Sequence, residues 1–398
     1  MLNSIPTSLE NCPSDDVDLY ADDVIRAPWP HYARLRAKGP VVWMAAHGNY
    51  AFTQYDIVRA ALRRPDVYIS SMGVAADDFG CSHLQGNTVA SDGARHAALR
   101  GAMQPPLTAT AVQAYRARIE EVAADLVDKA MAKGTIDAVV DLAQGLPLAV
   151  VRDLVGLPDF GRENMLKWAA AAFDVLGVQN DRGKTACAAI QEMRAFIGRE
   201  ATPDKLKPGS WTHRISEMAR AGKIDPDLAP FAIRDYMNPS LDTTISAIGH
   251  LIYFLARDPS AFQRLKEDPT LIPNAIHEAI RLGTPIRSFT RHTAMEVTEE
   301  GVVLPEGARV MMLFASANRD ACVFEAPDTF NMNRKNARRH LGFGAGVHMC
   351  VGMHLALLEI ECLIERLVDQ VLRFDLLDHD IDLNNSICAY SKLHVRMS

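Results

Sequence analysis

The sequence lacks features that would point to several classes of protein. It has no basic excess: 42 Lys and Arg stand against 49 Asp and Glu, and the formal net charge is −7. Nucleic acid is therefore not expected as a partner, because a phosphate-binding surface is normally basic. No run of about 18 apolar residues is present, so no membrane-spanning helix is expected. The first residues also lack the basic and apolar regions of a secretory signal.

Cysteines are few, and their arrangement excludes further classes. The seven cysteines are odd in number and scattered, without the paired spacing of a zinc site. Reduced thiols in a cytoplasmic protein fit this usage best. Low-complexity tracts, Gly/Ser linkers and internal repeats are also absent. We therefore expect a flexible leader over residues 1–22, a single domain over residues 23–398, and a monomer.

Helical patterns dominate the chain. Apolar residues at helical spacing predict most of the elements, and short runs bounded by turn residues predict a few strands. The turn-rich connection 177–183 is expected to be a mobile lid. The fold class is therefore mainly α with a minor β region. The expected helices span residues 28–38, 111–133, 164–176, 185–199, 227–256 and 273–282, and the expected strands span residues 41–44 and 50–53 and lie within 297–310.

Residues 343–352, with the sequence FGAGVHMCVG, form the most informative segment. Cys350 precedes a helix-forming run, and the N-terminus of a helix favours a thiolate. Glycines allow the backbone to approach a large flat group closely. A thiolate that donates electron density to haem iron supports O–O bond cleavage. A buried structural cysteine in a tight turn is the alternative interpretation.

The pattern F-G-x-G-x-H-x-C-x-G-x-x-L-A is present at every fixed position, and it resembles the haem-binding loop of the cytochrome P450 family. The resemblance extends from about residue 23 to the C-terminus and implies the cytochrome P450 fold. It implies haem b with Cys350 as the metal ligand, and Phe343 and Gly344 beside the cofactor. It also implies that the E-x-x-R pair Glu278 and Arg281 forms a buried triad with Arg334. The residues that the resemblance implies at the haem propionates are His96, Arg100, Arg291 and His348.

Asp242 and Thr243 lie within the predicted helix 227–256, where both residue types are unfavourable. The resemblance implies that such an acid and alcohol relay protons to dioxygen, and we expect Thr243 to hold water and Asp242 to resupply protons. The pair Pro239-Ser240 departs from the family, which usually has a small residue and then glycine. Proline inside a helix removes a hydrogen bond and costs roughly 3 kcal/mol. A kink of unusual shape is therefore expected.

The resemblance is nearest to the branch that oxidises para-substituted benzoates, including O-demethylation of methoxybenzoates. Met72 occupies the place where that branch uses an arginine for the substrate carboxylate, and Arg287 is a candidate replacement. Without a cation a buried carboxylate is unfavourable, so a neutral or amine-bearing aromatic is an equal alternative. Phe173 and Phe289 fall where that branch packs aromatic rings against its substrate, but ordinary core packing explains both residues equally well. The residues assigned to the substrate pocket are Met72, Phe173, Asp235, Asn238, Arg287 and Phe289.

The functional prediction is a haem-thiolate monooxygenase that hydroxylates or O-demethylates a small aromatic molecule with dioxygen. A tailoring enzyme that oxidises or couples a biosynthetic intermediate, with atypical oxygen or peroxide use, is the alternative within the fold. A haem-binding sensor is a third class, but it needs no proton relay. The basic run 334–340 on an acidic protein favours docking of an acidic ferredoxin. A ferredoxin and a ferredoxin reductase are the expected electron donors.

Overall fold

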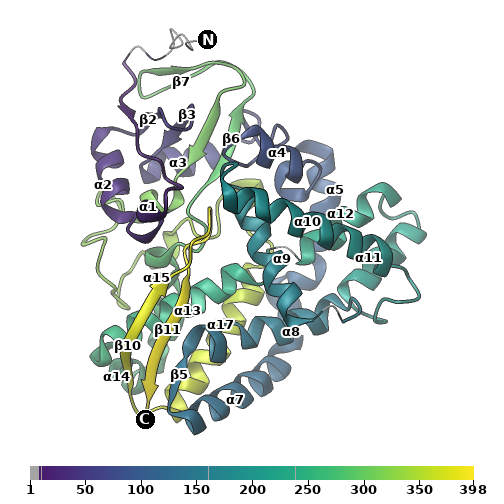
Figure 1. Ribbon diagram of the computed structural model, residues 1–398, viewed down its shortest axis with the longest axis vertical. Helices are drawn as coiled ribbons and strands as arrows, with labels where there is room; N and C mark the ends of the chain where they lie inside the picture. The colour runs from purple at the N-terminus through teal and green to yellow at the C-terminus, as the bar shows by residue number, and fades with distance from the viewer. Residues whose placement is uncertain (1–8, 10, 160, 238) are drawn as a thin grey trace.

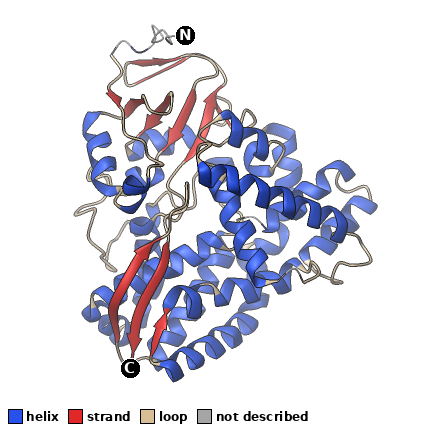
Figure 2. Ribbon diagram, viewed as in Figure 1, coloured by secondary structure: helices blue, strands red, loops and turns tan. Residues whose placement is uncertain are grey.

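The computed structural model describes residues 9, 11–159, 161–237 and 239–398 of the chain. Helices form most of the molecule, and the strands gather in two separate regions (Figure 2). One sheet has the strand order β1-β2-β3-β9-β6-β4, and a second has the order β10-β11-β5. The expected mainly α, single-domain fold with a minor β region is confirmed. In the described part of the chain, the helices are too short or too polar to cross a membrane.

The first sheet contains the predicted hairpin. Strands β2 (Val41–Met44) and β3 (Asn49–Phe52) are antiparallel, and Gly48 between them has a φ of 63°. The remaining strands of this sheet are β1 (Ser14–Asp15), β9 (Arg309–Met312), β6 (Phe289–Thr293) and β4 (Tyr68–Ile69). A two-stranded ribbon of β7 (Val297–Glu299) and β8 (Val302–Leu304) accompanies them.

Part of the expected leader belongs to this sheet. Strand β1 pairs in parallel with β2, and the buried Asp15 lies 2.8 Å from both Arg34 and Lys38. These bonds hold the pKa of Asp15 at about 2, although burial opposes the shift. Regular structure therefore begins before residue 23. A short strand pairs with the edge of β2, and its acid pairs with two cations of α2 (Trp29–Lys38).

Most of the predicted helices are confirmed, with small shifts at their ends (Figure 1). The segment predicted over 111–133 is divided, because a short helix and a 3₁₀ turn precede α7. A long helix, α17, follows the Cys350 loop and packs along α7. The helices used below are α3 (Tyr55–Leu62), α4 (Asp78–Leu84), α5 (Gly93–Met103), α7 (Arg116–Lys133), α9 (Arg162–Asp174), α10 (Asp181–Glu200), α11 (Trp211–Arg220), α15 (Ile272–Gly283) and α17 (Met353–Gln370).

The prediction of one long helix over 227–256 is wrong. The structure has two helices there, α12 (Ala229–Met237) and α13 (Asp242–Arg257). Pro239 has no N–H to donate, so the backbone ladder cannot continue through it. The hydroxyl of Ser240 donates to the Tyr236 carbonyl, which would otherwise lack a partner at the end of α12. The expected kink is therefore a complete break.

The second sheet brings a C-terminal loop against the helices. Strands β10 (Phe374–Ile381) and β11 (Tyr390–Met397) form a hairpin, joined at its edge by β5 (Thr135–Asp137). The loop 382–389 between β10 and β11 contacts α13, because the Cys388 carbonyl oxygen lies 2.9 Å from His250 Nε2 and also accepts from Ser246. The same loop reaches α9, where the Asn385 N–H donates to Asp174 Oδ1 at 2.7 Å.

The connection between α9 and α10 is shorter than the expected lid, since α10 begins at Asp181. It is attached on two sides. The Gln179 N–H donates to Asp77 Oδ2 at 2.7 Å, and the Ala76 N–H donates to the Leu176 carbonyl at 2.9 Å. On the other side, Asn180 donates to Asn385 Oδ1 at 2.8 Å. Its motion as a lid stays a prediction, and these bonds would have to break for it to move.

Candidate active site

The loop before α17 holds Cys350 in a fixed position. The Cys350 N–H donates to the Phe343 carbonyl at 2.9 Å, and the loop packs against the end of α3. Gly346 has a φ of 70°, and a Cβ there would lie 2.1 Å from the Leu62 carbonyl oxygen. Only glycine fits so close a contact between two backbones. Glycine at this position therefore sets how deeply the loop enters the molecule.

The environment of the Cys350 thiol has opposing effects on its acidity. Cys350 is an exposed residue, but desolvation of its thiol is the largest of these effects, and the pKa of the thiol is raised overall. Hydrogen bonds from the Gly352 and Met353 backbone lower the pKa, and so does the nearby positive charge of Arg100. Two backbone donors and a cation stabilise a thiolate, which is the form that binds iron. These donors suit an anionic sulfur ligand.

The four residues predicted at the haem propionates lie near the Cys350 loop. The rings of His96 and His348 are 4.2 Å apart between centroids, and Arg100 Nη2 donates to the Met349 carbonyl at 2.5 Å. His96 Nε2 is buried without a hydrogen-bond partner. Arg291 is buried, and desolvation lowers its pKa to about 10.

The nearest acid to this group is Asp92, which lies 3.5 Å from His348 Nε2 and accepts from the Ser70 and Ser71 N–H groups. One carboxylate thus serves the two histidines and Arg291, while Arg100 has the Cys350 thiol as its charge partner. Buried cations and unpaired donors are costly unless an anion joins them. The donor set therefore fits a planar group that carries two carboxylates at its edge, as haem does.

The predicted triad is confirmed. Glu278 and Arg281 are fully buried, with Arg281 Nε 2.7 Å from Glu278 Oε2. Arg334 Nε donates to Glu278 Oε1 at 2.8 Å, and the Asn331 N–H donates to the same oxygen at 3.1 Å. Arg281 also donates to the carbonyls of Asn318 and Pro327. The triad thus fastens α15 to the segment that leads into the Cys350 loop.

Asp242 and Thr243 form the first turn of α13, beside the break. The Thr243 hydroxyl donates to the Pro239 carbonyl at 3.0 Å. Burial, together with the negative charges of Asp382 and Asp174, raises the pKa of Asp242 to about 8. Burial likewise raises the pKa of Asp174 to about 6. Asp242 is therefore protonated at neutral pH and can donate a proton.

Sequence reasoning missed Asp174 and Asp382. They lie on α9 and on the loop 382–389, far from Asp242 along the chain. Neither residue belongs to a recognisable motif, and only the packing of α9 and the loop against α13 brings them near. The turn-forming residues Asn384, Asn385 and Ser386 could have indicated a structured loop but not its neighbours.

Two of the predicted pocket residues lie together. Phe173 is buried in an apolar cluster with Val74, Ala75 and Ile387, and Phe289 packs against the same cluster. Asn238 lies outside the described residues.

Of the other predicted pocket residues, Met72 lies at the surface, whereas Arg287 borders the cluster, because its N–H donates to the Ser386 carbonyl next to Ile387. Met72 is 53% exposed and lines a surface cleft of about 360 Å³ with Trp43 and Arg309. Asp235 is buried and accepts from the Thr88 N–H at 2.8 Å. Arg287 is buried and donates to the Asn384 carbonyl, while its Nη1 has no hydrogen-bond partner.

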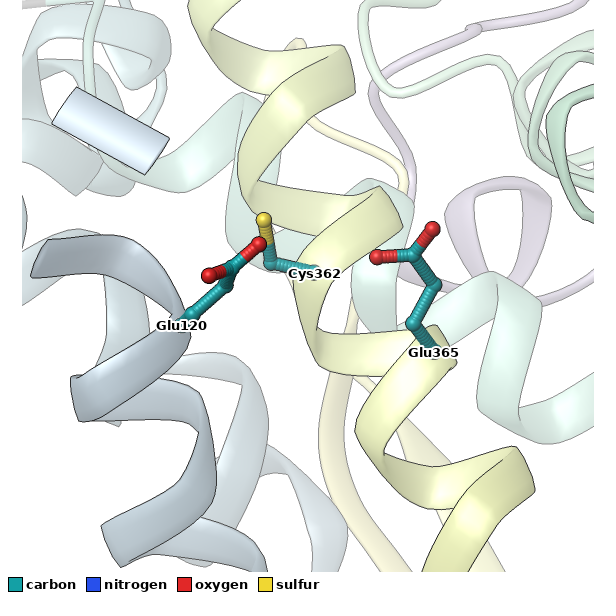
Figure 3. Close-up of side chains that lie close together, drawn as sticks. All are labelled: Glu120, Cys362 and Glu365. Carbon is teal, nitrogen blue, oxygen red and sulfur yellow. The ribbon is translucent and has the colours of Figure 1, made fainter. Parts of the chain in front are cut away.

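Cys362 on α17 is a second cysteine close to possible metal ligands. Figure 3 shows it with Glu120 and Glu365, whose ligand atoms lie within 4.8 Å of one another and of the sulfur. Arg116 already supplies positive charge there, since its Nη1 lies 3.4 Å from Glu120 and 3.5 Å from Glu365. Desolvation raises the pKa of Cys362 to about 12, so it stays a thiol. This cluster is an ion-pair network.

Fold and site together define a haem-thiolate enzyme, and comparisons with known proteins agree. The family model described as Cytochrome P450 matches residues 230–385. Cytochrome p450 CYP199A2 of Rhodopseudomonas palustris is 34% identical over 89% of this chain and 87% of its own length. Cyclomarin C epoxidase CymV of Salinispora arenicola is 32% identical over 83% of this chain and 85% of its own length.

Among solved structures, the CYP116B5 heme domain of Acinetobacter radioresistens has a TM-score of 0.86 and 22% identity, covering 96% of this chain and 97% of that one. The chain belongs to the cytochrome P450 family. It is a cytochrome P450 monooxygenase, and its cofactor is thiolate-ligated haem b.

Proposed function

We propose that this monooxygenase hydroxylates or O-demethylates a small aromatic substrate with dioxygen. The observation that carries the proposal is the apolar cluster that joins Phe173 of α9 to Phe289 of β6. Aromatic side chains that two different elements bring to one apolar cluster favour an aromatic ring as the substrate. The similarity to CYP199A2 over most of both chains supports the same branch of the family. Two electrons, two protons and dioxygen give the hydroxylated product and water.

We assign Cys350 as the axial ligand, and His96, Arg100, Arg291 and His348 as the partners of the propionates. Phe343 and Gly344 lie in the same loop and line the cofactor. Thiolate-ligated haem supplies dioxygen activation when it is bound. In an O-demethylation, hydroxylation of the methyl carbon gives a hemiacetal, which loses formaldehyde and leaves a hydroxyl group on the ring.

We assign the distal protons to Thr243 and Asp242. The Thr243 hydroxyl donates its hydrogen bond to the Pro239 carbonyl, so its oxygen can accept a hydrogen bond from water. Asp242 is protonated at neutral pH and can pass a proton to that water. Asp242 and Thr243 therefore hold a proton source and its acceptor site next to each other.

The electron donors are assigned to a ferredoxin and its reductase, in a cytoplasmic setting. Within the basic run, Lys335, Arg338 and Arg339 are exposed, whereas Arg334 is buried in the triad. Val347 and Met349 of the Cys350 loop are 50% and 42% exposed. Apolar side chains near exposed cations suit an acidic electron-transfer protein.

The ligand assignment is tested with Cys350→Ser and the matched variant Cys362→Ser. The reduced, carbon-monoxide-bound parent should show the red-shifted Soret band of a thiolate-ligated haem. Cys350→Ser should lose that band, and Cys362→Ser should keep it. The reverse result would refute the assignment. Substrate class is tested by screening methoxybenzoates against neutral anisoles and aromatic amines for a high-spin Soret shift. Aliphatic compounds that shift the band more strongly than all three would contradict an aromatic substrate.

A second candidate is a tailoring enzyme that oxidises or couples a biosynthetic intermediate. The break at Pro239-Ser240 favours this candidate, because two helices replace the continuous helix expected beside the residues assigned to proton delivery. The similarity to CymV, named as an epoxidase of cyclomarin C, gives further support. Turnover with hydrogen peroxide in place of the electron donors discriminates the two. Peroxide-driven rates equal to the donor-driven rate would favour this candidate.

A further inference from the structure

Three arginines from three helices meet at one short segment, residues 83–87. Arg95 of α5 donates from Nε and Nη2 to the Gly86 carbonyl at 3.2 and 2.9 Å. Arg194 of α10 donates to the His83 carbonyl, and Arg234 of α12 donates to Asn87 Oδ1 at 3.3 Å. The segment begins with the last two residues of α4 and leads toward α5. The guanidinium groups therefore converge although their helices are distant in sequence.

The arginine cluster, defined as Arg95, Arg194 and Arg234, has no carboxylate partner within the described part of the chain. Each side chain lies beyond salt-bridge distance of the described acids. The acid next in sequence, Asp235, instead accepts from the Thr88 N–H at 2.8 Å. Burial lowers the pKa of Arg234, and the positive charges of Arg194 and Arg95 lower it further. Asp235 acts on Arg234 and Arg95 from beyond salt-bridge distance and offsets part of this repulsion, so the three like charges are only partly compensated.

Phe231 holds two of these side chains in place. The guanidinium carbons of Arg95 and Arg234 lie 4.7 and 4.3 Å from the centre of its ring. A Cβ at Gly86 would lie 2.6 Å from the same ring, so the backbone is closely packed there. Arg234 Nε is buried and has no hydrogen-bond partner, whereas Arg95 is exposed. The cluster is therefore preorganised and reachable from solvent.

We propose that the arginine cluster is an oxyanion site, which takes a carboxylate or a phosphate group. Guanidinium groups offer several N–H donors in a planar fork that matches both oxyanions. A bound anion would neutralise the mutual repulsion of the three cations. It would also fasten the segment 83–87 to α5, α10 and α12 at once. The proposal does not depend on the aromatic substrate or on the roles assigned beside the haem.

The test measures anion binding to the haem-loaded enzyme. Inorganic phosphate is titrated against thermal unfolding, with sodium chloride at equal ionic strength as the reference. The unfolding midpoint should rise with the logarithm of phosphate concentration, since the anion binds the folded state. Arg194→Gln should weaken phosphate binding about tenfold, because it removes one charge-assisted contact. Arg199→Gln on the same helix removes an equal charge from an exposed position and should leave binding unchanged.

Two further experiments distinguish a carboxylate ligand from a phosphate ligand and control for misfolding of the variant. Benzoate that competes with phosphate in the parent, but not in Arg194→Gln, identifies a carboxylate ligand; binding of phosphate alone identifies a phosphate ligand. Arg194→Lys keeps the charge and should restore part of the phosphate response. Equal effects of phosphate and chloride, or equal responses of Arg194→Gln and Arg199→Gln, would overturn the proposal.

Discussion

The Thr243 hydroxyl donates a hydrogen bond to the Pro239 carbonyl oxygen, 3.0 Å away, across the break between α12 and α13. With Ser240 donating to the Tyr236 carbonyl, two hydroxyls bond carbonyl groups on either side of the interrupted helical ladder. The residue predicted to serve proton delivery thus also stabilises the break. Substitution of Thr243 should therefore affect both the stability of the break and proton delivery.

Replacing Thr243 separates these two contributions. Thr243→Ser keeps the hydroxyl and should retain most product formation. Thr243→Val keeps the shape but removes the bond to Pro239 and the water acceptor, so product formed per electron should fall by about 10²-fold, as for a lost proton-transfer group. Measuring electron-donor consumption beside product tests this, since consumption should continue. Equal product yields for the serine and valine variants would remove Thr243 from the proton path.

The raised pKa of Asp242 predicts a pH dependence of stability. The folded-state pKa of about 8 lies above the ordinary value of 3.8. Between these values the folded state binds a proton that the unfolded state does not, so stability falls as pH rises from about 4 to about 8. Asp242→Asn should reduce this fall, and unfolding midpoints across that range measure it.

Burial also raises the pKa of Glu359 to about 8, so the parent and the Asp242→Asn variant must be compared directly. Asp382→Asn serves as the control. Removing that charge should lower the pKa of Asp242, so the pH range over which stability falls should become narrower. Activity gives a second measurement: product formation should decline above about pH 8 in the parent, where Asp242 loses its proton. Parallel stability curves for the parent and Asp242→Asn would contradict the assignment.

The buried triad predicts a large loss of stability on a small substitution. Glu278→Gln leaves two buried guanidinium groups without their carboxylate, and breaking such a pair costs about 3–5 kcal/mol. The matched control is Glu217→Gln, which breaks a pair of the same i,i+3 spacing with Arg220, 47% and 60% exposed. Glu217→Gln should change the free energy of unfolding by no more than about 0.5 kcal/mol. Denaturant unfolding measures both, and similar losses would show that burial does not decide the outcome.

Local signals explain which elements could be predicted. The hairpin at Gly48 and the helix closed by Gly39 depend on turn chemistry within a few residues. The Cys350 loop is equally local, since its glycines and the following helix are contiguous. Pairing of Glu278 with Arg334 came from family resemblance, because spacing alone does not bring them together.

Long-range packing explains what could not be predicted. The apolar pattern continues through Pro239, so the sequence did not distinguish a kink from a break that hydroxyls cap. The approach of Asp174 and Asp382 to Asp242 arises where three elements meet. Periodicity describes which face of an element is buried, but not which residues of other elements cover it.

Exposed cations of the basic run predict a salt-dependent encounter with the electron donor. Arg338→Glu should slow reduction by an acidic ferredoxin roughly three- to tenfold at low ionic strength, because electrostatic steering is lost. Added salt should shrink the difference. Arg220→Glu on α11 makes the same charge change at another exposed site and should have little effect. Stopped-flow reduction across ionic strengths measures both variants. Identical salt dependence of the two would place the docking surface elsewhere, since a general change in net charge would then suffice to explain the slower encounter.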